Sequence, residues 1–127
     1  MPNLSNLTSY KKLILYQKAK ELVLIVYRIT ENFPKTKTYT LLPQMRRAAI
    51  SIMANIVEGY SKGTSAEYAR FLTISIGSLT EIEVYLDLCL DLKFITSTEF
   101  ERSFDLLVEV KKLLYVSRKT IRERIRQ

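Results

Sequence analysis

The basic residues near both ends of the sequence have types and spacing suited to one chemistry, electrostatic contact with phosphate groups. Residues 1–40 hold seven Lys or Arg against two acids and residues 118–127 hold five against one, whereas residues 41–117 are slightly acidic. Because clustered Lys and Arg side chains attract the phosphate groups of a polyanion, the pattern favours RNA or DNA as a partner. The candidate contact residues are Lys11, Lys12, Lys18, Arg28, Lys35, Lys37, Arg118, Lys119, Arg122, Arg124 and Arg126.

A surface whose charge serves only solubility is the alternative explanation of these residues. The basic residues at 118–126 spread around more than one side of a helix, which favours contact with a nucleic-acid backbone over readout of bases. A bundle could bring the two basic ends of the chain together or place them apart, and the sequence leaves both arrangements open. The eight tyrosines are scattered along the chain, so we interpret them as residues at the edge of the core.

A second set of polar residues lies in and near the apolar stretch 44–59. Charged side chains are rarely buried unless they are paired, so these residues need polar partners or a route to water. One interpretation is that they reach solvent at the helix ends. The other is a polar cluster between helices or between subunits, formed by Arg46, Arg47, Asn55, Glu58 and Arg70.

No constellation of residues in the sequence matches an enzyme or a metal site. The chain has no histidine and one cysteine, which removes the commonest general base and argues against a zinc site. Glu81 and Glu83 are two residues apart and therefore face different directions on a helix. Cys89 lies in a leucine-rich segment and is expected in the core. We expect a protein that is not an enzyme, with no catalytic residue, no metal and no cofactor.

Apolar residues spaced by three and four residues predict four helices that must position these side chains. Pro34 ends the first helix, and Gly63 can end the second at positive φ. Residues 64–67 and 96–99 each match a capping box that begins a helix. The connections are short, so the expected fold class is all-α, an antiparallel up-down-up-down four-helix bundle. The predicted helices span about 10–32, 42–61, 65–92 and 97–124.

The second and third predicted helices each carry two apolar stripes, more apolar surface than one small bundle buries. This excess indicates a homo-oligomer. The third helix also gathers acids in its C-terminal half, against the helix dipole, so we expect a basic neighbour there. These acids are Glu81, Glu83, Asp87 and Asp91.

The length and composition fit a single domain. The 127 residues are 47% hydrophobic and 26% charged, as in ordinary globular proteins. Residues 1–127 are expected to form one bundle, with residues 1–8 and the last few residues frayed. A single cysteine and the lack of a signal peptide or membrane span predict a cytoplasmic protein that does not contact membranes.

Three stretches of the chain resemble a family of bacterial proteins. They are YQKAKEL at 16–22, NFPKTKTYTLLPQMRRAAISIMANIVEG at 32–59 and ARFLTISIGSLTEIEVYL at 69–86. In this order they resemble the four-helix bundle proteins encoded by intervening sequences within 23S rRNA genes. The resemblance covers most of residues 10–95. It implies a homopentameric ring of up-down bundles, no enzymatic activity, and binding of nucleic acid.

A related group, the accessory variability proteins of diversity-generating retroelements, shares the bundle and binds a reverse transcriptase through a basic surface. The resemblance therefore implies a reverse transcriptase or another nucleic-acid enzyme as an alternative partner to RNA or DNA. The chain departs from the family at Tyr16, Thr40 and Met53, where Trp, Gly and Pro are usual. Without that proline the second helix is expected to be straighter. A self-assembling structural module with no nucleic-acid ligand is the remaining alternative.

Overall fold

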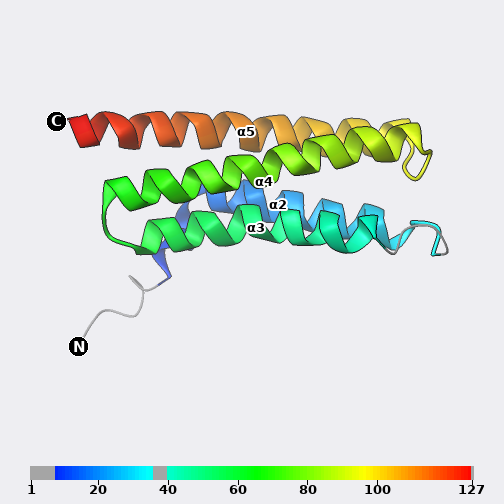
Figure 1. The fold of residues 1–127 in the computed structure, drawn as a ribbon, viewed down its shortest axis with the longest axis horizontal. Coiled ribbons are helices and arrows are strands. Elements are labelled where there is room, and N and C mark those ends of the chain that lie inside the picture. The colour runs from blue at the N-terminus through cyan, green and yellow to red at the C-terminus, as the bar shows by residue number, and fades with distance from the viewer. Residues whose placement is uncertain (1–7, 36–39, 127) are drawn as a thin grey trace.

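The computed structural model describes residues 8–35 and 40–126, which form helices joined by short connections and include no strand. A 3-10 turn, η1 (Ser9–Lys12), precedes four α-helices. They are α2 (Ile14–Glu31), α3 (Leu41–Ser61), α4 (Ser65–Asp91) and α5 (Ser97–Arg126). Consecutive helices run in opposite directions in Figure 1, and α5 packs back against α2 to close the bundle. The predicted all-α fold is confirmed.

The first helix begins later than the sequence predicts. Leu13 has an extended backbone, with φ −69° and ψ 126°, so a separate turn precedes α2 in place of a continuous helix from residue 10. Two contacts stabilise this break. The Gln17 side chain donates a hydrogen bond to the Lys11 carbonyl at 3.0 Å, and the Tyr10 ring packs edge-on against Tyr16.

The fourth helix ends later than predicted. α5 continues to Arg126 and so includes the residues that were expected to fray, apart from residue 127, which lies outside the described part of the chain. Residues 1–7, also expected to fray, lie outside it as well. The C-terminal end of α5 extends past the α3–α4 turn in Figure 1.

One core runs through the bundle. Leu72, Leu79 and Leu86, spaced by seven residues along α4, are fully buried, as the helical periodicity predicts. Cys89 is also buried, with its Sγ 3.6 Å from the Met45 Sδ, and burial raises the pKa of its thiol to about 11. No helix in the described ranges is long and apolar enough to cross a membrane.

The second apolar stripes of α3 and α4 are only partly buried. Phe71 is buried, whereas Ile50 on α3 and Ile74 and Leu88 on α4 are 40–43% exposed. The basic neighbour expected for the acids of α4 is present at one of them, because Lys111 of α5 pairs with Glu83 at 3.2 Å.

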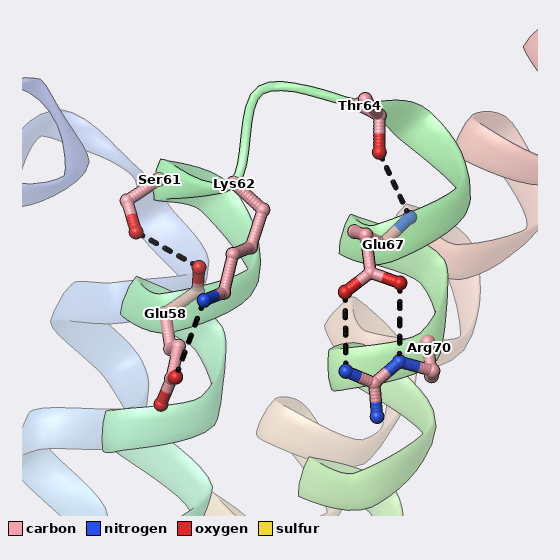
Figure 2. Close-up of polar contacts among 6 residues, drawn as sticks. All are labelled: Glu58, Ser61, Lys62, Thr64, Glu67 and Arg70. Carbon is pink, nitrogen blue, oxygen red and sulfur yellow. Dashed lines mark hydrogen bonds and ion pairs between the residues drawn. The ribbon is translucent and has the colours of Figure 1, made fainter.

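The two predicted capping boxes differ in outcome. At 96–99 both bonds form: the Thr96 N–H donates to the Glu99 carboxylate at 2.9 Å, and the Glu99 N–H donates to the Thr96 hydroxyl at 3.1 Å. At 64–67 only the Glu67 N–H to Thr64 hydroxyl bond forms, at 3.2 Å, since the Glu67 carboxylate binds Arg70 (Figure 2). Gly63 has φ +84°, as predicted for a helix terminator.

Candidate nucleic-acid interface

Lys11, Lys12 and the basic residues of 118–126 lie at the same end of the bundle. η1, the α3–α4 turn and the last turns of α5 all lie at the same end in Figure 1. The Ser9 hydroxyl is 3.2 Å from the Tyr60 hydroxyl, which joins η1 to the end of α3, and Arg124 lines a hollow beside Tyr60. We call this region the basic end and define it as residues 8–16, 59–70 and 115–126. Of the two arrangements that the sequence left open, the structure therefore has the one in which basic residues from both ends of the chain lie at the same end of the bundle.

Seven of the eleven candidate contact residues lie at the basic end. Six of them are exposed, and Arg118 is half-buried, where it donates to the Thr73 hydroxyl at 3.2 Å and lies over the Tyr115 ring. None of the seven takes part in an ion pair within the described part of the chain, although one acid, Glu123, lines a shallow hollow together with four of them. The seven are Lys11, Lys12, Arg118, Lys119, Arg122, Arg124 and Arg126.

The other four candidates are not part of this cluster. Lys18 pairs with Glu109 at 3.2 Å and with Glu21 at 3.6 Å, and the hydrogen bond to Glu109 raises the pKa of Lys18. Arg28 and Lys35 lie toward the opposite end of the bundle, near the C-terminal end of α2. Lys37 lies outside the described residues.

Two further cations lie at the basic end, but each is paired (Figure 2). Lys62 contacts Glu58 at 3.6 Å, and Arg70 makes a two-pronged contact with Glu67 at 3.1 and 3.3 Å. The hydrogen bond between Arg70 and Glu67 raises the pKa of the guanidinium and lowers the pKa of the carboxyl. The i to i+3 and i to i+4 spacings in the sequence are the signals of these pairs.

The five residues of the second polar set do not form one cluster. Arg46 joins α3 to α2, because its Nε donates to the Thr30 hydroxyl at 2.9 Å and its guanidinium lies 4.5 Å over the Tyr27 ring. Glu58 on α3 and Arg70 on α4 take part in separate pairs near the α3–α4 turn, as Figure 2 shows.

The remaining two members lie on the α4 side of α3. Asn55 donates to the carbonyl and hydroxyl of Ser51, and the Ser51 hydroxyl is 2.8 Å from that of Ser78 on α4. Arg47 is exposed and, together with Ser51 and Ser78, lines a groove between α3 and α4. These interhelical serine contacts were missed from the sequence, because hydroxyl pairing depends on the rotation of both helices.

The tyrosines are scattered in the sequence but not in space. Five of the seven tyrosines in the described ranges lie at the basic end. The eighth tyrosine, Tyr39, lies outside those ranges. The Tyr60 and Tyr68 rings meet edge-on, with centroids 5.8 Å apart and an interplanar angle of 81°. Tyr60 and Tyr115 remain 36% and 44% exposed. The five are Tyr10, Tyr16, Tyr60, Tyr68 and Tyr115.

An open hollow of about 210 Å³ lies between the α3–α4 turn and the last turns of α5. Burial raises the pKa of the Tyr68 hydroxyl above its ordinary value. Among the residues that the structure describes, no three His, Cys, Asp or Glu side chains are grouped as a metal site requires. The hollow is lined by Tyr60, Gly63, Thr64, Ser65, Tyr68, Ile121 and Arg124.

Comparisons with known proteins agree with this fold. The family model described as 23S rRNA-intervening sequence protein matches residues 11–116. The chain is similar to a solved protein of unknown function from the S23 ribosomal protein family of Bacteroides thetaiotaomicron VPI-5482. The sequence identity is 24% over 80% of this chain and 94% of that chain, with a TM-score of 0.75. No curated protein matches the sequence.

Proposed function

This chain belongs to the family of 23S rRNA-intervening sequence proteins, and we propose that it is a non-enzymatic, homo-oligomeric bundle protein that binds nucleic acid through its basic end. The observation that carries this proposal is the presence, at one end of the bundle, of seven cations from the two ends of the sequence, none of which takes part in an ion pair among the described residues. The family model matches residues 11–116, so the basic residues at 118–126 lie outside the matched region.

The charge of the bundle is distributed unequally along its length. The opposite end carries exposed acids at the end of α4 and the start of α5, among them Asp91, Glu101 and Asp105. The same end also carries exposed cations, among them Arg28, Lys93 and Arg102, so acids and bases are mixed there. A polyanion is therefore attracted more strongly to the basic end, and this difference orients it during association. The cations extend from η1 and from several sides of α5, which suits contacts to phosphates more than to base edges.

Exposed apolar residues on α3 and α4 support the homo-oligomer in this proposal. Ile50, Ile74 and Leu88 lie on these two neighbouring helices and are each about two-fifths exposed. Exposed apolar side chains are the kind of surface that can associate with other proteins. A ring of five copies is what the family resemblance implies, and such a ring would multiply the basic field. These residues alone would also suit a self-assembling module without a nucleic-acid ligand, which is the second candidate function.

A matched pair of variants tests the proposal. The basic-end variant carries Arg122→Gln, Arg124→Gln and Arg126→Gln; the control variant carries Arg28→Gln, Lys35→Gln and Arg102→Gln at the opposite end. Both lower the net charge equally. A labelled structured RNA is titrated with each at low salt, and only the basic-end variant should bind it more weakly. Equal weakening would contradict a role for the basic end, and no binding by the native chain would favour the structural module.

A further inference from the structure

We propose that the basic end prefers single-stranded over duplex nucleic acid, with an unpaired base stacking on the exposed ring of Tyr60. This inference rests on the proposed function and specifies the ligand of that same surface. Proteins that bind single strands combine a cationic surface that follows the backbone with aromatic rings on which bases stack. The basic end brings both features together in three dimensions, although they are far apart in the sequence.

The Tyr60 ring is held in place and still open to solvent. Its edge-on contact with Tyr68 and the contact of its hydroxyl with the Ser9 hydroxyl at 3.2 Å limit its rotation. Even so, 36% of the residue surface remains exposed. A ring that is already ordered loses little conformational entropy when a base stacks on it, so this fixed position favours binding.

The close approach of α3 and α4 creates this arrangement. Gly59 precedes Tyr60, and a Cβ atom at Gly59 would lie 3.2 Å from the Tyr68 ring and 2.6 Å from the Phe71 Cβ. Only a residue without a side chain lets the start of α4 come so near to the end of α3. The two tyrosines therefore meet because of a glycine that has no other evident role at this end.

The hollow beside Tyr60 has the chemistry that a base and its phosphate require. Ile121 and the tyrosine rings offer apolar surface to the faces of a base, and the Thr64 and Ser65 side chains offer hydroxyl groups to its polar edge. Arg124 lines the same hollow, is exposed, and takes part in no ion pair among the described residues. Its guanidinium can neutralise the adjoining phosphate.

A duplex could use only half of these features. Its phosphates would meet the cations, but its bases are stacked on one another and offer no free face to Tyr60. Single strands should therefore bind with the charge contacts and the stacking contact, and duplexes with the charge contacts alone.

The experiment compares a labelled single-stranded RNA of about twelve nucleotides, within the usual site size, with the same strand annealed to its complement. The native protein should bind the single strand more tightly. Tyr60→Leu should weaken single-strand binding by about 5- to 100-fold, the usual effect of removing one stacking ring, and leave duplex binding unchanged. Tyr60→Phe keeps the ring and should keep the preference. Tyr85→Leu, in the other half of the bundle, is the matched control and should bind as the native chain does.

The outcomes separate this inference from the proposed function. If the native protein binds both forms equally, or if Tyr60→Leu weakens both equally, the single-strand inference is overturned while nucleic-acid binding stands. If neither form binds at low salt, the proposed function itself fails. The native comparison needs no variant, so the test remains decisive even if Tyr60→Leu does not fold.

Discussion

Gly59 of α3 lies so close to Phe71 of α4 that a Cβ atom added to Gly59 would be 2.6 Å from the Phe71 Cβ. Both atoms are attached directly to a helix backbone, so neither can move away by rotating a side chain. Gly59→Ala should therefore separate the helices and destabilise the protein by about 1–3 kcal/mol, the usual cost of overpacking. The midpoint of denaturant unfolding measures this loss.

Gly77 on α4 is the matched control for that substitution. Nothing lies within 4 Å of a Cβ placed there, and the residue is exposed in the middle of a helix. Gly77→Ala should stabilise the protein by about 0.5–1 kcal/mol, because alanine restricts the unfolded chain and favours a helix. Stabilisation by both substitutions would contradict the close approach at Gly59.

Lys93 holds a backbone conformation that favours glycine. Its φ is +60°, and it ends α4 in a Schellman motif in which the Phe94 N–H bonds to the Cys89 carbonyl and the Lys93 N–H bonds to the Leu90 carbonyl. Lys93→Gly should stabilise the protein by about 1 kcal/mol, since a left-handed conformation is unfavourable for residues with a side chain.

An exposed lysine within a helix serves as the control for that prediction. Lys112→Gly in α5 should destabilise the protein by about 1 kcal/mol in the same denaturation experiment, because glycine is a poor helix former. If both substitutions to glycine destabilised the protein, Lys93 would not have the left-handed backbone conformation described above.

The buried thiol of Cys89 should lower the free energy of unfolding at alkaline pH. Burial raises the pKa of its thiol from an ordinary 9.0 to about 11. Between these values the folded protein holds a proton that the unfolded chain has lost, so raising the pH favours unfolding. Thermal melts from pH 8 to pH 11 should show a shallower decline for Cys89→Ala than for the native chain. Parallel declines would show that the thiol does not contribute.

The exposed apolar residues of α3 and α4 predict the oligomer. Ile74→Asp, in the second apolar stripe of α4, should dissociate it, whereas Val116→Asp on α5, outside the two partly exposed stripes, should not. Light scattering coupled to gel filtration measures the mass of each variant. If the native chain is a monomer at micromolar concentration, the proposed homo-oligomer is wrong.

The helices could be predicted from the sequence because their signals are local. Apolar spacing, Gly63 and the capping box at 64–67 placed α3 and α4 within one residue of their observed ends. The break at Leu13 was missed, since the apolar pattern continues across it and its stabilising contacts involve side chains on both sides. Periodicity marks the face of a helix but does not report a single extended residue within it.

The candidate site was less predictable because it depends on tertiary packing. The sequence identified the cations but not that η1 and the end of α5 meet, because helix direction and loop course together decide this. It also placed Tyr60 and Tyr115 among core-edge residues, although both are exposed beside cations. They share one end of the bundle because α3 and α5 run in the same direction, each antiparallel to α4, so the C-terminal parts of both helices lie at that end.

The salt dependence of RNA binding reports how many cations of the basic end contact phosphates. If about five basic-end cations contact phosphates, log K should fall with log salt at a slope of about −4 to −5, from about −0.9 per contact. The basic-end variant with Arg122→Gln, Arg124→Gln and Arg126→Gln should have a slope shallower by about 2 to 3, and the control variant should keep the native slope. A slope that is the same for all three proteins, or that is near zero, would contradict binding through the basic end.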